Sequence, residues 1–212
     1  MRIIVVRHGE TDWNKEGRYQ GKLDIPLNDK GKRQAEMLAK ALSSYEIDII
    51  YSSPLKRALE TAKIIDLEHR APIFVRDELK EISHGRWEGL LLSEVKRTYG
   101  ELYEMWKREP EKVIMPEGES LKMVYDRVNP FLEELKRRYR SETVLIAGHD
   151  GVNKIIFCAL LDLPLSYFWR FKQDNASFSI LETISEDGKF CLRHFNDICH
   201  LSSLGETVEG AL

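Results

Sequence analysis

The sequence predicts an α/β protein of three layers, in which helices cover both faces of a mainly parallel sheet. Two observations predict this class. Short runs of consecutive apolar residues recur along the 212-residue chain, and such runs are typical of strands buried on both faces. Between them lie longer stretches with apolar residues every three or four positions, which is the spacing of an amphipathic helix. Strands that alternate with helices in this way form parallel sheets covered by helices.

In the first half of the chain, capping residues mark where two helices begin. The elements predicted here are strands over residues 3–6, 47–51 and 73–75 and helices over residues 28–42 and 53–62. Each strand is a short apolar run, of which Ile3–Val6 is the clearest. Asn28 precedes an apolar stripe of helical spacing and is a good N-cap. Ser53 before Pro54 combines an N-cap residue with proline at the first helical position.

The second half of the chain continues the alternation. We predict helices over residues 90–107, 120–135 and 152–161 and strands over residues 143–147, 178–181 and 190–195. Residues 115–118 (MPEG) separate the first two of these helices, and residues 186–189 (EDGK) are a turn between the last two strands. No linker rich in Pro, Gly or Ser divides the chain, so we expect one domain over residues 1–212. It has a helical insertion over about residues 88–118 and a C-terminal tail over about residues 200–212.

Composition and charge argue against several classes of protein. Lys and Arg total 32 and Asp and Glu total 35, so the net charge of −3 argues against a nucleic-acid partner. The three cysteines, Cys158, Cys191 and Cys199, have no CxxC spacing, so neither a disulfide framework nor a zinc site is expected. The apolar run near the N-terminus is too short for a signal peptide or a membrane span. We therefore expect a cytoplasmic protein without a membrane partner.

Polar side chains with catalytic chemistry follow the predicted strands. Arg7 and His8 follow the first strand, and Arg57 lies in the first turn of the helix after the second. Glu81 comes shortly after the third strand, and His149 directly follows the fourth. In sheets of this kind, ligands bind outside the carboxyl ends of the strands. We therefore expect these five residues to share one crevice although they lie far apart in the sequence.

The chemistry of this set fits a phosphate ester. Arg7 and Arg57 each present a planar fork of donors that matches a phosphate group. A neutral His8 can attack phosphorus through one ring nitrogen, and a protonated His149 can donate to the phosphate. The leaving oxygen needs a proton, and Glu81 is a source of one if partial burial raises its pKa.

Two more residues, Asn14 and Asp150, are candidates for completing the phosphate site, the first by its side chain and the second by the backbone near it. A metal site built from the same histidines and carboxylates is the alternative. It is disfavoured because the arginines would repel a cation and because no HExxH-like spacing occurs. We therefore expect neither a metal nor another cofactor.

Several stretches of the chain resemble the histidine phosphatase superfamily, which includes the cofactor-dependent phosphoglycerate mutases. They are RHGETDWN (7–14), RYQGKLDIPLNDKGKRQA (18–35), YSSPLKRALETA (51–62), EISHGRWEG (81–89), PEGESL (116–121) and AGHDG (147–151). These stretches run in the family's order and cover nearly the whole chain. The resemblance implies a phosphoglycerate mutase-like fold and an enzyme that needs no metal.

The resemblance also implies a function for each candidate. By it, His8 is the nucleophile that becomes a phosphohistidine, and Glu81 is the general acid and base. The phosphoryl group is bound by Arg7, Arg57, His149 and Asn14. Asp150 departs from the family, in which small residues are frequent at this place, so its carboxylate must point away from the phosphate or repel it.

A phosphatase is favoured over a mutase. The acid site reads EISHG, whereas the mutases are similar to ERHYG there, and this chain is shorter than theirs. The segment EISHGRWEG and the stretches CALLDLPLSYFWRF, DNASFS and CHL are similar to the metal-independent phosphoserine phosphatases. The implied substrate is therefore a small phosphorylated metabolite, with L-phosphoserine first. An α-ribazole phosphate phosphatase, a broad phosphomonoesterase and a non-catalytic phosphoprotein-binding relative are the alternatives.

Four residues are candidates for selecting the substrate. His84 and His200 are donors for the carboxylate of phosphoserine, and Gln20 and Gly21 lie in one of the shared stretches. In the alternative interpretation, His84 packs against Trp87 and His200 is an ordinary residue of the tail. The resemblance also suggests a homodimer, for which the sequence offers no independent sign.

Overall fold

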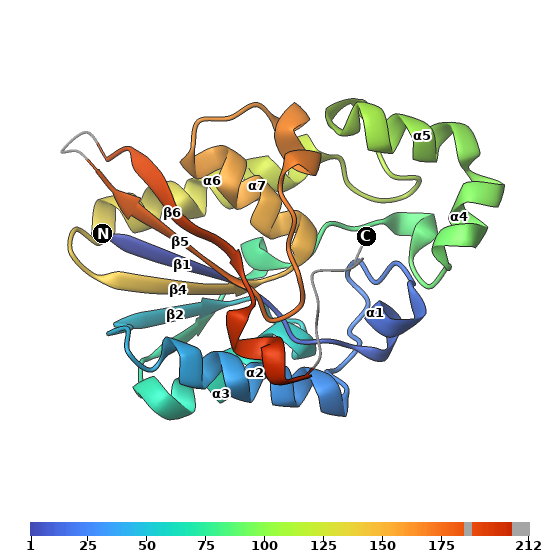
Figure 1. The fold of residues 1–212 in the computed structure, drawn as a ribbon. Helices are drawn as coiled ribbons and strands as arrows, with labels where there is room; N and C mark the ends of the chain where they lie inside the picture. Colours follow the sequence, from blue (N-terminus) through green and yellow to red (C-terminus); the bar gives the residue numbers. More distant parts are fainter. Residues whose placement is uncertain (185–187, 205–212) are drawn as a thin grey trace.

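Six strands form one mixed sheet in the computed structural model, which describes residues 1–184 and 188–204 (Figure 1). The strands are β1 (Arg2–Arg7), β2 (Ile49–Ser52), β3 (Ile73–Val75), β4 (Thr143–Gly148), β5 (Phe178–Thr183) and β6 (Phe190–Asp197). Their order across the sheet is β3–β2–β4–β1–β5–β6. The pairs from β3 to β1 are parallel, whereas β5 and β6 add antiparallel pairs at one edge. The prediction of a mainly parallel sheet is confirmed.

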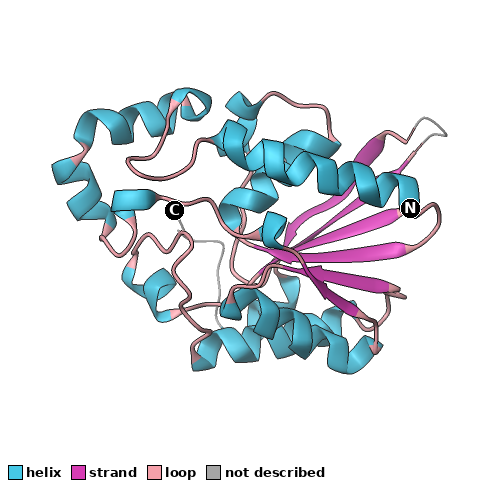
Figure 2. Ribbon diagram, turned by 180° about the vertical axis from the view of Figure 1, so that it is seen from behind, coloured by secondary structure: helices cyan, strands magenta, loops and turns pink. Residues whose placement is uncertain are grey.

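Helices cover both faces of the sheet, so the predicted three layers are confirmed (Figure 2). The α-helices are α1 (Asp12–Glu16), α2 (Asp29–Leu42), α3 (Lys56–His69), α4 (Leu92–Thr98), α5 (Gly100–Arg108), α6 (Leu121–Arg138) and α7 (Asp150–Leu160). Strand β1 separates two cores because successive side chains point to opposite faces. Ile4 and Val6 pack in the core with α2 and α3, while Ile3 and Val5 pack in the core with α6 and α7.

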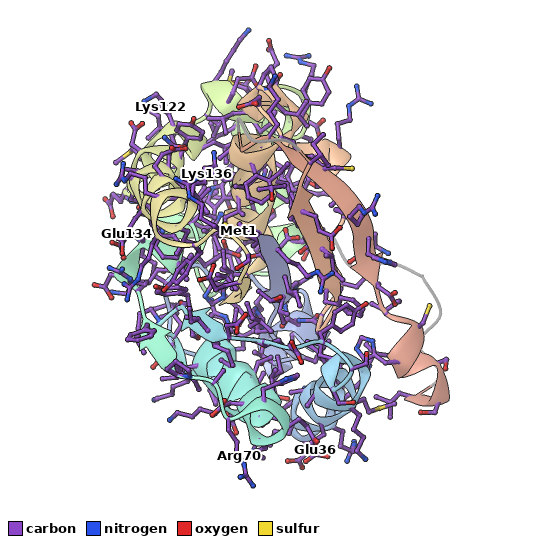
Figure 3. The ribbon with its side chains drawn as sticks, turned by 90° about the vertical axis from the view of Figure 1, so that its left-hand side faces the viewer. Met1, Glu36, Arg70, Lys122, Glu134 and Lys136 are labelled. Atoms are coloured by element: carbon purple, nitrogen blue, oxygen red, sulfur yellow. The ribbon has the colours of Figure 1, made fainter. Side chains whose placement is uncertain are left out.

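Charged side chains lie on the outer faces of these helices, as Figure 3 shows for Glu36 and Lys122. Along α6, the exposed Lys122 pairs with Asp126, four residues on, and the half-buried Lys136 pairs with Glu133, three residues back. Ion pairs of this kind at or near the surface add little stability. The apolar stripe on the inner face of α6 therefore accounts for its packing against the sheet.

Two helices begin at other residues than predicted. Helix α3 starts at Lys56 with Leu55 as its N-cap, so the prediction of Ser53 as the cap is wrong. The reason is tertiary, because the Ser53 hydroxyl lies 2.8 Å from Nε2 of His149 on the neighbouring strand end. Helix α7 starts at Asp150, two residues before the predicted start.

The segment between β1 and β2 and the segment before α6 also differ in detail from the predictions. The short helix α1 was not predicted, and a capping box between Thr11 and Asn14 stabilises its N-terminus. The predicted helix over residues 90–107 is two helices, α4 and α5, which are separated at Tyr99. Part of the predicted turn at 186–189 and most of the predicted tail lie outside the described residues. Within the described chain, no helix is both long and apolar enough to span a membrane.

Candidate active site

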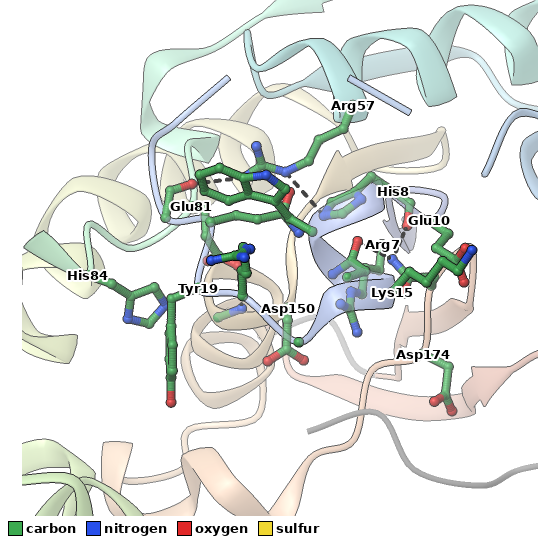
Figure 4. Close-up of a pocket in the computed structure, with 18 of the residues that line it drawn as sticks. Arg7, His8, Glu10, Lys15, Tyr19, Arg57, Glu81, His84, Asp150 and Asp174 are labelled. Carbon is green, nitrogen blue, oxygen red and sulfur yellow. Dashed lines mark hydrogen bonds between the residues drawn. The ribbon is translucent and has the colours of Figure 1, made fainter. Parts of the chain in front are cut away.

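The carboxyl edge of the parallel strands borders a pocket of about 740 Å³ (Figure 4). Arg7, His8, Arg57 and Glu81 line this pocket, and His149 joins them through a hydrogen bond with Arg57. The structure thus brings together all five residues for which the sequence predicts a shared crevice. Strand order is the cause, because β2, β4 and β1 are parallel neighbours whose carboxyl ends meet at one edge.

His8 is a buried, neutral ring whose unprotonated nitrogen faces an arginine. Its Nδ1 lies 2.6 Å from the carbonyl oxygen of Gly9, which can only accept, so Nδ1 carries the proton. Its Nε2 therefore keeps a lone pair and accepts from Nε of Arg57 at 3.2 Å. Burial and the charges of Arg57 and Arg7 hold the pKa of His8 well below its ordinary value. A neutral imidazole of this kind is a competent nucleophile.

Arg57 joins the two histidines of the site. Its Nε donates to Nε2 of His8 and to Nδ1 of His149, each at 3.2 Å. Its two terminal nitrogens donate to the carbonyl oxygens of Leu23 and Gly21, each at 2.8 Å. Burial lowers the pKa of Arg57 to about 10, so the side chain is still a cation at neutral pH. The guanidinium is held in one orientation before any ligand arrives.

His149 is neutral as well, whereas from the sequence we consider a protonated His149 that donates to the phosphate. Its Nδ1 accepts from Arg57, so its Nε2 carries the proton and donates to the Ser53 hydroxyl at 2.8 Å. Burial, followed by the charge of Arg57, holds its pKa well below the ordinary value. His149 is therefore an acceptor for Arg57.

Arg7 and Asn14 both line the same pocket. The Nη1 of Arg7 donates to the carbonyl oxygen of Gln173, while its buried Nε has no hydrogen-bond partner among the described residues. The side-chain oxygen of Asn14 accepts from the Thr11 amide at 3.1 Å and from the Asn175 side chain at 3.2 Å. A ligand can therefore reach Asn14 through its amide nitrogen.

Glu81 is held at the N-terminus of α7. Its two carboxylate oxygens accept from the backbone amides of Gly151 at 3.1 Å, Val152 at 3.0 Å and Ile82 at 2.9 Å. Burial and the charge of Asp150 raise the pKa of Glu81, and the amide hydrogen bonds oppose this shift. The close approach of the Glu81 carboxylate to the start of α7 requires glycine at 151, because a Cβ atom there would lie 2.7 Å from Oε1 of Glu81.

Asp150 also lines the pocket, and its carboxylate points away from Arg57 and His8 (Figure 4). Its Oδ2 lies 2.8 Å from Nζ of Lys154, which is 3% exposed. The orientation agrees with the expectation that this carboxylate must avoid a phosphate bound between the arginines. The ion pair with Lys154 explains how a buried lysine is tolerated beside the site.

Two of the candidates for substrate selection, His84 and Gln20, line the pocket. His84 packs edge-to-face against Tyr19 with 4.9 Å between ring centroids, and burial lowers its pKa to about 4. Its Nδ1 is buried without a hydrogen-bond partner among the described residues, and the same holds for Oε1 of Gln20. Both side chains line the pocket, so each offers an unused polar atom near a ligand.

The other two candidates are placed differently. Gly21 lines the pocket at a φ of +52°, and its carbonyl oxygen holds Arg57, so it serves the phosphate end. His200 does not join the residues that line the pocket, where Ile198 is found instead. Its Nε2 lies 3.1 Å from the carbonyl oxygen of Ala176, which keeps the ring against the protein. Sequence similarity alone cannot show which way a residue after the last strand turns.

The sequence does not identify the residues that position the segment carrying Glu81. Arg127 on α6 donates to the carbonyl oxygens of Lys80 at 2.8 Å and Glu81 at 3.2 Å, and it contacts the carboxylate of Glu119. This network fixes the segment that carries Glu81. It gave no local signal, because an arginine on an amphipathic helix normally faces solvent. Within residues 1–184 and 188–204, no group of three or more His, Cys, Asp or Glu side chains is arranged for a metal ion.

Acidification is expected to destabilise the folded protein. His8, His84 and His149 have lowered pKa values when folded, whereas in the unfolded chain they take up a proton near pH 6.5. Below about pH 6.5 the unfolded state therefore binds more protons, and the free energy of unfolding falls by at most about 1.4 kcal/mol per pH unit for each histidine. For His84 this continues down to its folded pKa of about 4. Glu81 opposes the trend, because its raised pKa adds stability at low pH that is lost as pH rises.

Urea unfolding at several pH values between about 7.5 and 5 measures this dependence. A His84→Gln variant is the matched comparison, since it removes one titrating group, and we expect its stability to fall less steeply with acid. A free energy of unfolding that stays constant over this range contradicts the prediction.

Comparison with known proteins agrees with this fold and site. The family model of the histidine phosphatase superfamily (branch 1) matches residues 3–198. Phosphoserine phosphatase 1 of Hydrogenobacter thermophilus is 43% identical over 201 residues, which cover 95% of this chain and 94% of that protein. A solved structure of Bacillus stearothermophilus YhfR is 33% identical with a TM-score of 0.87 and covers 94% of this chain and 98% of that one.

A third relative has been solved with a ligand. It is a mutant phosphoserine phosphatase from Entamoeba histolytica in complex with phosphoserine, and it is 29% identical to this chain. Its TM-score is 0.82, and the match covers 94% of this chain and 98% of that chain. Fold, site and relatives together define an α/β phosphatase. The chain belongs to the histidine phosphatase superfamily, and the family expected from its motifs is confirmed.

Proposed function

We propose that this phosphatase transfers the phosphoryl group of a small phosphorylated metabolite to Nε2 of His8 and then to water, without a metal. The observation that carries the proposal is the 2.6 Å contact between Nδ1 of His8 and the carbonyl oxygen of Gly9, which fixes the tautomer of His8. Its proton is on Nδ1, bound to the Gly9 carbonyl oxygen, so the lone pair of Nε2 lies beside Arg57 in the pocket. The nucleophilic nitrogen and a cation that can bind the phosphate therefore lie next to each other in the pocket.

In the first step, Nε2 of His8 forms a bond to phosphorus while the bond from phosphorus to the ester oxygen breaks. The electron pair of that bond leaves with the ester oxygen, which takes the proton of Glu81. Arg57 and Nε of Arg7 stabilise the charge on the remaining phosphoryl oxygens. The raised pKa of Glu81 supports its function as the general acid, because its carboxyl group stays protonated to a higher pH than the carboxyl group of an ordinary glutamate.

In the second step, the Glu81 carboxylate takes a proton from water as the water oxygen bonds to phosphorus. The bond from phosphorus to His8 breaks, its electron pair returns to Nε2, and inorganic phosphate leaves. The cationic side chains of Arg57 and Arg7 lower the proton affinity of His149, and a bound phosphate raises it again because it adds negative charge near the ring. His149 can then donate to the phosphate from Nδ1.

The substrate that we propose is L-phosphoserine. Its support is the relative named for this substrate, which matches nearly the whole chain. The pocket adds support, because beyond the phosphate end it offers unused polar atoms on His84 and Gln20. α-Ribazole phosphate and a broad range of phosphomonoesters are the competing substrates.

Phosphate release from a substrate panel in the presence of a chelator tests the proposal. The panel contains L-phosphoserine, phosphothreonine, 3-phosphoglycerate, α-ribazole phosphate and p-nitrophenyl phosphate. We expect kcat/KM for phosphoserine to exceed the others about a hundredfold, which is about 2.7 kcal/mol of discrimination. A flat profile leaves a general phosphatase, and a maximum at α-ribazole phosphate replaces the substrate.

His84 is expected to act in substrate binding rather than in the chemical step. Because its folded pKa is about 4, the ring is neutral and contributes a hydrogen bond rather than a charge. Replacing His84 by alanine should raise KM for phosphoserine about tenfold, with little change for p-nitrophenyl phosphate. The exposed His194 provides the control variant, His194→Ala. Equal effects of His84→Ala on both substrates contradict the selective function.

A further inference from the structure

One carboxylate of the pocket, that of Asp150, lies at the start of the helix beside the residues that bind an anion. Asp150 is the first residue of α7, directly after His149, and it lines the pocket together with Arg7 and Arg57. Its side chain is 22% exposed and points away from the arginines (Figure 4). A negative charge so near a bound phosphate weakens its binding. A substrate that brings a positive charge to Asp150 offsets this repulsion.

The carboxylate of Asp150 is held in place but keeps an unused oxygen. Its Oδ2 pairs with Lys154 at 2.8 Å, four residues along α7. The lysine packs in turn over the rings of Phe168 and Trp169, at 5.1 and 4.6 Å from the ring centroids. Within the described residues, the side chain of Asp150 is hydrogen-bonded through Oδ2 alone. Oδ1 therefore remains as an acceptor for a ligand.

Other carboxylates of the pocket are less suited to bind a ligand cation. Glu10 pairs with Lys30 at 3.1 Å through one oxygen and accepts from the Asn28 side chain at 3.0 Å through the other. Asp174 pairs with Lys172 at 3.1 Å and also accepts from the Asn196 side chain at 2.6 Å through its other oxygen.

The first turn of α7 connects Asp150 to the reacting groups. The next two amides of the chain, at Gly151 and Val152, hold the carboxylate of Glu81, and the residue before it is His149. Asp150 is therefore next in the chain to the groups at the reacting centre, and a substituent a few bonds from the ester oxygen is the part of a substrate that we expect it to meet. In phosphoserine, four covalent bonds separate phosphorus from the ammonium nitrogen.

We propose that Asp150 selects phosphomonoesters that carry an ammonium group near the phosphate, by accepting a hydrogen bond from that ammonium. This inference rests on the proposed function, because it places the phosphate at His8. It extends that function by naming the recognised chemistry as an amine and the residue that recognises it as Asp150. Hydrogen bonds between charged groups discriminate by about tenfold to a hundredfold.

Two pairs of substrates that differ only in the amine measure this recognition. One pair is L-phosphoserine and (S)-3-phosphoglycerate, in which a hydroxyl replaces the ammonium. The other is phosphoethanolamine and n-propyl phosphate, in which a methyl group replaces it. The quantity measured is the ratio of kcat/KM within each pair, so a general loss of activity cancels.

The test variant is Asp150→Asn combined with Lys154→Met, because the single Asp150→Asn change leaves a buried lysine unpaired. Thermal unfolding shows whether the double variant folds, and the single Asp150→Asn and Lys154→Met variants are measured beside it. We expect both ratios to fall at least about tenfold in the double variant. Lys154→Met alone should raise both ratios, because it leaves the Asp150 charge uncompensated. Asp174→Asn, which removes another pocket carboxylate, is expected to leave both ratios unchanged.

The inference is overturned if the wild-type enzyme prefers the amine in neither pair, or if the double variant keeps the wild-type ratios. It is also overturned if Asp174→Asn, and not the change at Asp150, removes the preference. The proposed substrate is judged separately. A wild-type enzyme that prefers another compound of the panel rejects phosphoserine, while a fall of the phosphoethanolamine ratio in the double variant still assigns the amine to Asp150.

Discussion

Replacing His8 by alanine is expected to lower kcat about 10⁴-fold or more for every phosphate ester. No described neighbour can replace its nucleophilic nitrogen, because His149 is fully buried, does not line the pocket and has its Nε2 against Ser53. The variant should still fold. The His8 side chain makes few contacts that alanine would break, namely the Gly9 and Arg57 hydrogen bonds and an edge-on ring contact with His149.

Rapid acid or base quenching with labelled substrate checks the nucleophile directly. The wild-type protein should hold a phosphoryl group that is stable to base and lost in acid, as expected of a phosphohistidine, and His8→Ala should hold none. The exposed His194 again supplies a matched control, since His194→Ala removes an imidazole that does not line the pocket. Substantial phosphate release by a folded His8→Ala protein would falsify the assignment.

Replacing Glu81 by glutamine is expected to lower kcat/KM for phosphoserine by about 10²–10⁴-fold. The amide keeps the size of the side chain but cannot donate a proton to the serine oxygen or accept one from water. The loss in the first step should be smaller for p-nitrophenyl phosphate, whose leaving group departs without a proton. Glu78→Gln changes a carboxylate three residues away that does not line the pocket, and it should leave the rate unchanged.

The pH dependence of kcat/KM adds a second measurement for Glu81. The first step needs His8 neutral and Glu81 protonated. The lowered pKa of His8 keeps the ring neutral to a lower pH than usual, and the raised pKa of Glu81 keeps the carboxyl protonated to a higher pH than usual. We therefore expect the alkaline fall of kcat/KM in the wild type to disappear in Glu81→Gln. An identical alkaline limb in both proteins argues for another general acid.

The strands and the family follow from local features of the chain. Buried strands are runs such as Ile3–Val6, and their apolar pattern does not depend on what surrounds them. The N-caps at Asn28 and Ser120 are equally local, because each side chain bonds to an amide three residues ahead. Ligands bind outside the carboxyl ends of parallel strands, so the residues that follow the strands predict which side chains share the pocket.

The helix starts and the state of each catalytic group depend on contacts between distant segments. Ser53 has the local pattern of a cap, yet its hydroxyl lies against His149, which is 96 residues away in the chain. His149 is neutral for the same kind of reason, since burial and Arg57 act on it from other elements. His200 turns toward Ala176 rather than the pocket, which a short sequence match cannot show.

Chemical identity and chemical state are thus decided at different levels. The order of residues along the chain assigns histidine, arginine and glutamate to the strand ends, because strand patterns and family motifs are local. Only the packed structure decides that Nε2 of His8 keeps its lone pair, that Glu81 gains a raised pKa, and that Asp150 keeps one oxygen for a ligand. Protonation and hydrogen-bond direction depend on burial and on nearby charges, and both arise when β1, α3 and α7 meet.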